Sequence, residues 1–458
     1  MLSNDKKQMD NKFVTCRLAQ YAATLSYEDI PEEVLTVAKH CLLDWFGITI
    51  SGSQDTASRF VFEECLEASG APQASILGKG VKLPILQAAL VNGFFSHILD
   101  FDDVHLTIPG HSTAPVAPAV VALAERDKLS GRDLLTAFVA GVELTCRIGL
   151  FLTPKHYDLG WHTTGTVGTF GAAAAASRLL NLAPNECATA LGIAGTQAAG
   201  LKCMFGTMCK PLQAGKAASN GLYAALLARR GFTSRADVLE CIQGFCETHT
   251  SGLDVEAALQ DLGNRFYIRD VLFKHHVASF GTIATIEAAQ SIRNEQRIAS
   301  TNIDRIQIRV PVEELRVCFV EHPTTGLEAK FSFPHTVAMA LTGKNTSSIA
   351  SYDRESYSDS VLVALRQKTQ VIGDKTLTAG IGEVTVFLKD GSVFQKLANI
   401  CEPERDLLTQ TRKLENKFLT IASPIIGEER AREAIAQLTT LETLDNLDNL
   451  MELCRTCD

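Results

Sequence analysis

Helical periodicity fills residues 1–271 of this 458-residue chain and constrains its fold more than any other feature. From Glu32 to Phe46, apolar residues recur at intervals of three and four, which is the pattern of an amphipathic helix. Pro31 precedes this run and Gly47 follows it, so we expect the helix to begin and end there. Alternating strand patterns are nearly absent from the same segment. The sequence therefore predicts a large helical domain.

The pattern changes shortly after residue 300, where apolar and polar residues begin to alternate. Ile306, Ile308 and Val310 alternate with polar neighbours, as in a half-buried strand. Two further alternating runs flank Asp390-Gly391, a dipeptide typical of tight hairpin turns. Helical patterns return after residue 403. We therefore expect a mostly α protein, with a large helical domain at residues 1–271 and 402–458 and a smaller α+β domain at residues 272–401.

Two stretches rich in alanine and glycine, residues 165–176 and 215–228, stand out within the helical part. The second follows Pro211, which we expect to open a helix that ends near Gly231. Small residues spaced three and four apart allow two helix axes to approach closely. A glycine-rich phosphate loop is the alternative, but neither stretch follows a strand pattern or contains the spacing of such loops. We therefore interpret both as tightly packed helices.

Composition and charge argue against some classes of binding partner. Hydrophobic residues make up 46% of the chain and charged residues 21%, which is typical of a folded globular protein. Lys and Arg total 43 against 52 Asp and Glu, so the net charge is −9 and opposes binding to nucleic acid. The first 13 residues are charged without a following apolar run, and we find no uninterrupted apolar segment of roughly 18 residues. We expect a cytoplasmic protein that binds neither nucleic acid nor membrane.

The chain has 13 scattered cysteines, an odd number that favours a reducing compartment over a disulfide framework. One CxxC pair, Cys454 and Cys457, lies at the C-terminal end. A structural zinc site needs further ligands at matching spacing, and we find no second pair. We therefore interpret these two residues as tail thiols rather than as a metal or redox site.

Carboxylates and imidazoles gather in the segment after an apolar helix pattern. Asp100, Asp102, Asp103 and His105 fall within six residues, and His111 follows shortly after them. Such groups at a helix end can form a divalent-metal site, a general acid and base pair, or a set of helix caps. The metal alternative would be a hydrolase that binds its ion through the first four of these residues. Spacing alone does not choose among the three.

Three further segments carry polar residues at places where a binding site can form. His162 precedes the first small-residue helix, where backbone amides can hold a carboxylate; the alternative is a capped helix with a core histidine. Lys210 lies just before Pro211 and is by default a surface lysine. Lys274 and His276 lie at the expected domain boundary, where clefts form.

Together with Glu328-Ala329-Lys330-Phe331-Ser332, these segments in this order resemble the MmgE/PrpD family, from about residue 42 to residue 400. The resemblance implies a cofactor-free and metal-free homodimeric enzyme that acts on a small di- or tricarboxylate in a cleft between the two domains. Position by position, it assigns catalytic roles to Asp100, His111, His162 and Lys210. It places Lys274 among the substrate-binding residues. Further candidates for substrate binding are Gln213, and His276 and His105, which have no secure counterpart in the family.

The chain departs from the family pattern at several positions. Val104 stands where family members have a hydroxyl residue, and Ile283 stands where they have a histidine. Phe319 aligns with a tyrosine of the decarboxylases, and Gln213 with a common histidine. These changes count against a decarboxylase. They equally fit a different or larger substrate, because the loss of polar partners favours a more apolar ligand group.

The residues support proton transfer at a carbon next to a carboxylate. Lys210 and Lys274 would neutralise substrate carboxylates, and His111 would exchange the proton. His162 would carry a second proton, and Asp100 would orient an imidazole or the substrate. We expect a lyase that resembles 2-methylcitrate dehydratase. The alternatives are an enzyme like cis-aconitate decarboxylase, one like iminodisuccinate epimerase, or a homologue that binds a carboxylate without catalysis.

Overall fold

The structure is a computed structural model that describes residues 13–68, 70–152 and 155–456. Most of the N-terminal segment in which we found charge without an apolar run lies outside the described residues, as does Cys457. Cys454 is described, and it is fully buried rather than a tail thiol. Burial raises the pKa of its thiol to about 12.

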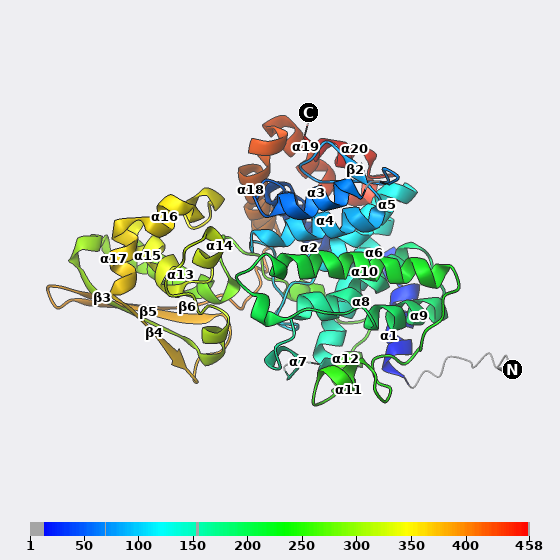
Figure 1. The fold of residues 1–458 in the computed structure, drawn as a ribbon, viewed down its shortest axis with the longest axis horizontal. Coiled ribbons are helices and arrows are strands. Elements are labelled where there is room, and N and C mark those ends of the chain that lie inside the picture. The colour runs from blue at the N-terminus through cyan, green and yellow to red at the C-terminus, as the bar shows by residue number, and fades with distance from the viewer. Residues whose placement is uncertain (1–12, 69, 153–154, 457–458) are drawn as a thin grey trace.

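Helices dominate the larger part of the molecule, as the periodicity predicts (Figure 1). The helices of the first 260 residues are α1 (Val14–Thr24), α2 (Glu32–Gly52), α3 (Ser58–Glu67), α4 (Ile85–Ile98), α5 (Thr113–Asp127), α6 (Gly131–Leu152), α7 (Lys155–Asp158), α8 (Thr163–Leu179), α9 (Pro184–Gly195), α10 (Cys209–Arg229), α11 (Phe245–His249) and α12 (Val255–Leu259). A two-stranded hairpin of β1 (Ala74–Ser75) and β2 (Lys82–Leu83) lies among them.

The two small-residue stretches form helices that pack against each other, which confirms their interpretation. A Cβ atom on Gly221 of α10 would lie 2.5 Å from the Cβ atom of Ala172 of α8. On another face of α10, a Cβ atom on Gly93 of α4 would lie 2.8 Å from the Cα atom of Gly215. Only glycine permits main chains to approach this closely. Helix α10 is thus fixed between α4 and α8, the two helices whose ends carry candidate site residues.

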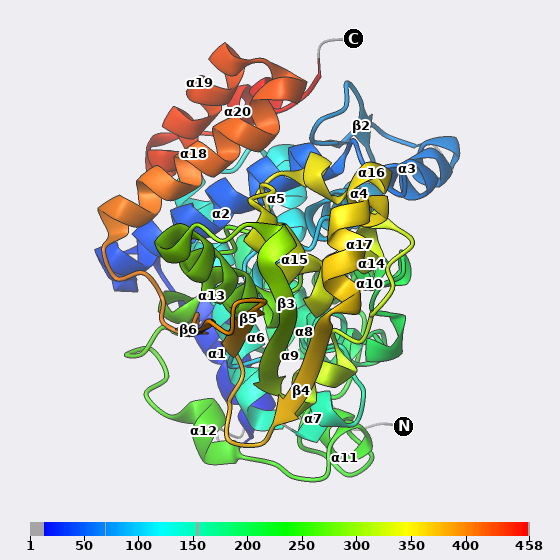
Figure 2. The same ribbon diagram turned by 90° about the vertical axis from the view of Figure 1, so that its left-hand side faces the viewer.

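The smaller part contains the predicted sheet (Figure 2). Its strand order is β4-β3-β5-β6, with β3 parallel to β4 and antiparallel to β5. Residues 306, 308 and 310 of β3 are buried, and Gly391 forms the predicted hairpin turn with φ +89°. The elements of this part are β3 (Ile303–Pro311), β4 (Thr369–Asp374), β5 (Ile381–Leu388), β6 (Val393–Asn399), α13 (Phe280–Gln296), α14 (Gly326–Ala329), α15 (Phe333–Thr342), α16 (Arg354–Ser358) and α17 (Ser360–Gln367).

The last three helices pack on the larger part and not on the sheet (Figures 1 and 2). They are α18 (Leu407–Ile426), α19 (Glu428–Thr439) and α20 (Asp448–Leu453). Helix α18 runs beside α2 and explains why α2 continues past Gly47, where we predicted its end. A Cβ atom on Gly47 would lie 2.9 Å from the Phe418 ring, so this glycine serves helix packing. The mostly α fold with a smaller α+β part is confirmed; the exact domain bounds stay a prediction.

Helices α2 and α6 are long and apolar enough to cross a membrane by length and composition alone. In the structure, 83% of the apolar window of α2 and 94% of that of α6 are buried inside the protein. Their apolar residues therefore belong to the hydrophobic core.

Candidate active site

A cavity of about 340 Å³ lies between the helical part and the smaller part. Its polar and charged lining residues include Asp100, His111, Tyr157, Lys202, Lys210, Lys274, Ser279 and Glu314. Its apolar lining residues include Val104, Leu106, Phe205, Phe280, Val317 and Phe331. A concave site with apolar walls and a few convergent charged groups is the usual form of a small-molecule site.

Asp100 is the charged centre of the inner end of the cavity. It follows α4 in the left-handed backbone conformation, with φ +51°, which turns the chain sharply. Its Oδ1 atom accepts hydrogen bonds from Lys210 Nζ over 2.8 Å and from Lys274 Nζ over 2.9 Å. Burial raises the pKa of Asp100, but the two ammonium groups outweigh it and hold this pKa well below its usual range. Two lysines against one aspartate leave this cluster with a positive charge for a substrate carboxylate.

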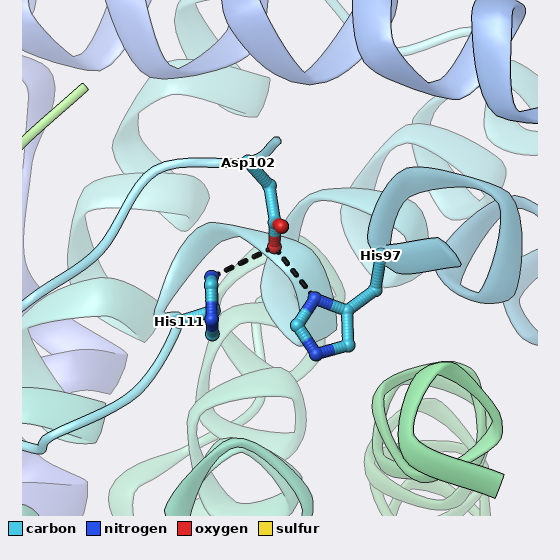
Figure 3. Close-up of side chains that lie close together, drawn as sticks. All are labelled: His97, Asp102 and His111. Atoms are coloured by element: carbon cyan, nitrogen blue, oxygen red, sulfur yellow. Dashed lines mark hydrogen bonds and ion pairs between the residues drawn. The ribbon is translucent and has the colours of Figure 1, made fainter. Parts of the chain in front are cut away.

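His111 is held by hydrogen-bond acceptors on one side of its ring (Figure 3). Its Nδ1 atom lies 2.6 Å from the main-chain oxygen of Asp103 and 2.9 Å from Oδ2 of Asp102. We therefore assign the Nδ1 proton to these acceptors, which leaves Nε2 for proton exchange. Nε2 lies 4.0 Å from Oδ1 of Asp100, in the cavity wall. Asp102 can stabilise the positive charge that the ring gains with a second proton.

His97 shares the same carboxylate from the other side (Figure 3). Its Nδ1 atom lies 2.8 Å from Oδ2 of Asp102, and its ring meets the His111 ring edge to face at 4.5 Å. Burial lowers the pKa of His97 to about 4, although Asp102 opposes this shift. The side chain is therefore neutral at pH 7 and serves to hold Asp102 in place.

His97, Asp102 and His111 also form a group whose ligand atoms lie within 4.8 Å of one another, close enough for a metal ion. Both Nδ1 atoms face the same Asp102 oxygen at hydrogen-bond distance. Hydrogen bonding alone thus accounts for the arrangement. The metal set that we considered from the sequence is not assembled, because its four side chains face different partners. Asp103 accepts a bond from Thr113 and His105 contacts the main-chain oxygen of Tyr267.

His162 lies behind the cavity and is not among its lining residues. Its Nδ1 atom lies 2.6 Å from Oε1 of Gln213, and its ring packs edge to face on Phe205, which does line the cavity. Burial and the neighbouring cation of Lys210 hold the pKa of His162 well below its usual range. Gln213 therefore contacts His162 and not the cavity, so the prediction that it binds substrate is not supported by its position.

Two further predicted residues also lie away from the cavity. His105 is fully buried, and its two ring nitrogens face the Tyr267 carbonyl and the Thr107 amide. His276 uses its nitrogens on Thr346 and Glu287. Neither imidazole has a free nitrogen for a substrate, so we leave both out of the site.

Lys210 is positioned differently from our expectation. Helix α10 begins at Cys209, so Lys210 lies in its first turn and not in the preceding loop. Pro211 is tolerated in this turn because its missing N–H has no acceptor there. The Nζ atom of Lys210 lies 5.4 Å from the ring centres of both Phe205 and Phe331, and the side chain is buried rather than on the surface.

The structure also places the residues at which the chain departs from the family pattern. Val104 lines the cavity, so an apolar side chain forms part of its wall at the position where family members have a hydroxyl residue. Ile283 is buried in α13, and Phe319 is 60% exposed outside the lining. Of these three changes, only Val104 alters the cavity wall directly.

Sequence reasoning missed several residues that act around the cavity. His97 lies in an apolar helix pattern, where a single histidine gives no functional signal. Lys330 belongs to a recognised motif without an assigned role, and its Nζ atom donates to the last-turn carbonyl of Leu99. Burial lowers the pKa of Lys330 to about 8. No sequence pattern indicated a role for Glu314 or Lys417, because their positions depend on packing between distant segments.

Comparison with known proteins agrees with this architecture. The model of the MmgE/PrpD N-terminal domain matches residues 16–258, and that of the MmgE/PrpD C-terminal domain matches residues 276–443. A cis-aconitate decarboxylase of Aspergillus terreus is 28% identical over 452 residues, covering 92% of this chain and 91% of the relative. A cis-aconitate decarboxylase of Homo sapiens is 28% identical over 444 residues, covering 93% and 91%. A cis-aconitate decarboxylase-like protein of Aspergillus oryzae is 32% identical over 296 residues, covering 61% of each chain. The chain belongs to the MmgE/PrpD family.

Proposed function

We propose that this protein is a cofactor-independent lyase that decarboxylates a small acid with at least two carboxylates. One observation carries the proposal: His111 is the only imidazole among the cavity-lining residues of the described chain, and it lies beside a cluster of net positive charge. Decarboxylation needs one proton donor and a site for the remaining carboxylate. The names of the full-length relatives, which are cis-aconitate decarboxylases, support the same reaction class.

In this reaction, Lys210 and Lys274 bind the carboxylate that stays on the substrate. The carbon–carbon bond to the other carboxylate breaks, and its electron pair remains on carbon as CO₂ leaves. The negative charge on that carbon is stabilised where it can delocalise toward the carboxylate held by the lysines. The imidazolium of His111 then donates its Nε2 proton to the carbon, and the ring regains a proton from solvent. The net reaction consumes one proton and releases one CO₂.

The apolar wall favours the same step. Val104, Leu106 and Phe331 line the cavity together with the His111 ring. A carboxylate in apolar surroundings loses hydration, whereas neutral CO₂ does not. An apolar wall next to the leaving carboxylate therefore destabilises the reactant relative to the product.

Dehydration, which we favoured from the sequence, requires a second proton carrier for the departing hydroxyl. His162 was expected in that role, but it lies behind Phe205 and outside the cavity lining. Epimerisation also needs two proton carriers, on opposite faces of one carbon. Either reaction would need another cavity group, such as Glu314, as the second proton carrier, whereas decarboxylation needs only His111. We therefore place 2-methylcitrate dehydration and iminodisuccinate epimerisation behind decarboxylation.

Proton NMR in D₂O on the purified enzyme tests the proposal. The panel contains cis-aconitate, 2-methylcitrate, citrate, iminodisuccinate and the dicarboxylate 2-methylmalonate, with His111→Asn as the variant and Asp304→Asn as an exposed control. We expect signals of a decarboxylated product that carries one deuterium in a new C–D bond, and no such product with His111→Asn. Olefin formation from 2-methylcitrate, or exchange without net change, would instead identify a dehydratase or an epimerase. Equal turnover by His111→Asn would contradict our assignment of the proton donor.

Homodimer assembly and a cytoplasmic location remain proposals drawn from the family resemblance and the sequence. Light scattering during size-exclusion chromatography measures the first directly.

A further inference from the structure

The acidic side chain of Glu314 lines the cavity, and the proposed reaction does not use it. It lies in the short helix Val312–Arg316 and lines the cavity together with Gly281 of α13. A Cβ atom on Gly281 would lie 2.2 Å from Oε2 of Glu314, so the glycine gives the carboxylate its place against the first turn of α13. Among the residues that the structure describes, none forms a hydrogen bond or an ion pair with the Glu314 carboxylate. An unpaired acid in a cavity wall is available to a ligand.

The nearby cation of Lys202 does not neutralise Glu314 through contact. Lys202 Nζ donates to the main-chain oxygen of Tyr157 over 3.1 Å and lies 3.4 Å from the centre of the Tyr157 ring. The other charged lining residues on this side are Asp158, Glu313 and Arg316. The basic group of Lys202 is thus engaged by a carbonyl and an aromatic ring.

The surplus positive charge of the cavity lining therefore belongs to Lys210 and Lys274 and not to the residues around Glu314. Over the whole lining, the bases Lys202, Lys210, Lys274 and Arg316 are matched by the acids Asp100, Asp158, Glu313 and Glu314, which gives a formal charge of 4 − 4 = 0 with His111 neutral. The surplus of one positive charge lies where Lys210 and Lys274 share Asp100. Such a cavity matches one carboxylate at the Asp100 cluster. Around Glu314 the two bases Lys202 and Arg316 face three acids, so the charge there is 2 − 3 = −1 and disfavours a further carboxylate.

We propose that Glu314 is a specificity-determining residue: it disfavours acids with three carboxylates and selects dicarboxylates whose remaining part is apolar or donates a hydrogen bond. The apolar walls fit the same ligand, because Val104 and Val317 offer no polar partner to a third carboxylate. This inference rests on the proposed function, because both require that this cavity binds the substrate acid.

The selectivity should depend on pH. Burial raises the pKa of Glu314 to about 7; the Lys202 cation opposes the shift, and Glu313 adds to it. The titratable and charged groups around it are Tyr157, Asp158, Lys202, Glu313, Arg316, Cys318 and Cys401. As pH rises through 7, Glu314 ionises and repels a neighbouring carboxylate more strongly. Discrimination against tricarboxylates should therefore be stronger at pH 8 than at pH 6.

Binding of two unreactive acids tests this inference independently of turnover. The probes are 2-methylsuccinate, a dicarboxylate with an apolar methyl group, and propane-1,2,3-tricarboxylate. Isothermal titration calorimetry at pH 8 is compared for the unsubstituted enzyme, Glu314→Gln and the matched control Glu321→Gln. We expect the unsubstituted enzyme to bind the dicarboxylate more tightly. Glu314→Gln should strengthen binding of the tricarboxylate roughly tenfold, with little change for the dicarboxylate. Glu321→Gln should change either constant by less than about threefold, because Glu321 is exposed to solvent and does not line the cavity.

The outcomes separate this inference from the proposed function. Tighter tricarboxylate binding by the unsubstituted enzyme, or an unchanged ratio in Glu314→Gln with native circular dichroism, overturns the role of Glu314. Failure of both acids to bind overturns it as well. If the ratio shifts as expected while no acid in the NMR panel reacts, the dicarboxylate 2-methylmalonate included, the specificity role stands and the proposed decarboxylation fails.

Discussion

Lys417 Nζ donates a hydrogen bond of 2.9 Å to the main-chain oxygen of Lys274, so helix α18 contacts the segment that carries a cavity lysine. The same ammonium group donates to the main-chain oxygen of Phe101, also over 2.9 Å, and pairs with Asp44 of α2 at 2.8 Å. Phe101 directly follows Asp100. One buried cation therefore fixes the backbone next to both Asp100 and Lys274, which are themselves hydrogen-bonded at the inner end of the cavity.

Lys417→Met should reduce kcat by about 10- to 100-fold with a smaller change in KM, because the two backbone segments lose their common donor. It should also lower the free energy of unfolding by roughly 3 kcal/mol at pH 8, since Asp44 loses its buried partner. Burial raises the pKa of Asp44 to about 6 even with Lys417 present, so the loss should be smaller at pH 5. Kinetics and urea unfolding measure both effects.

The double variant Asp44→Asn/Lys417→Met separates positioning from stability. It removes the uncompensated carboxylate, so stability should recover while kcat stays low. Lys413→Met is the matched control on the same helix, where Lys413 forms a half-exposed ion pair with Glu404. If kcat recovers together with stability in the double variant, Lys417 has only a structural role.

The sequence predicts the elements of this fold well because they depend on local patterns. The helical periodicity, the alternation in Ile306, Ile308 and Val310, and the Asp390-Gly391 turn all correspond to observed elements. The end of α2 was predicted wrongly because glycine has two roles in helices. It is typical of the position just after a helix, but its lack of a side chain also lets a neighbouring helix pack closely. Gly47 does the second, against Phe418.

The candidate site is predicted only in part because its geometry depends on contacts between distant segments. Asp100, Lys210 and Lys274 are separated by up to 174 positions and meet at one carboxylate oxygen. The motif resemblance brings them together, whereas spacing alone does not. His162 carried a motif signal but lies behind the Phe205 ring, and no local pattern reports which side of a ring a histidine occupies.

Asp102→Asn should reduce kcat by about 100-fold and leave the binding of 2-methylsuccinate nearly unchanged. The amide keeps the shape of the carboxylate but cannot stabilise the charge that His111 gains on protonation, and Asp102 does not line the cavity. Rates at saturating substrate and calorimetric binding constants measure the two effects. A large loss of binding with an unchanged kcat would show that Asp102 shapes the cavity rather than the proton transfer.

Lys210→Met should weaken the binding of 2-methylsuccinate by roughly 30-fold, because the cluster with Asp100 and Lys274 changes from one net positive charge to zero. Lys202→Met is the matched control: it also removes one ammonium group from the cavity wall, but one that is already engaged by Tyr157. We expect a change of less than about threefold in this control. Equal losses in the two variants would mean that the carboxylate is not held at the inner end.

Asp103 gives a pH-dependent contribution to stability with a definite sign. Burial raises its pKa to about 8; the hydrogen bond from Thr113 and the repulsion from Asp44 act in opposite directions on it. In the unfolded chain an aspartate has a pKa of about 3.9, so the folded state binds one more proton between pH 4 and 8. Stability from this group is therefore complete below pH 4 and is lost progressively as pH rises to 8.

Asp103→Asn removes this titration. The unfolding free energy of the unsubstituted protein minus that of the variant should therefore fall by about 1 kcal/mol per pH unit from pH 5 to pH 8. Asp304→Asn, at an exposed strand position, should give a difference that does not depend on pH over the same range. Urea unfolding at pH 5, 6, 7 and 8 measures both series. A difference that stays constant for Asp103→Asn would mean that the Asp103 carboxyl is ionised throughout, and that Thr113 and the surrounding dipoles stabilise its charge more than burial penalises it.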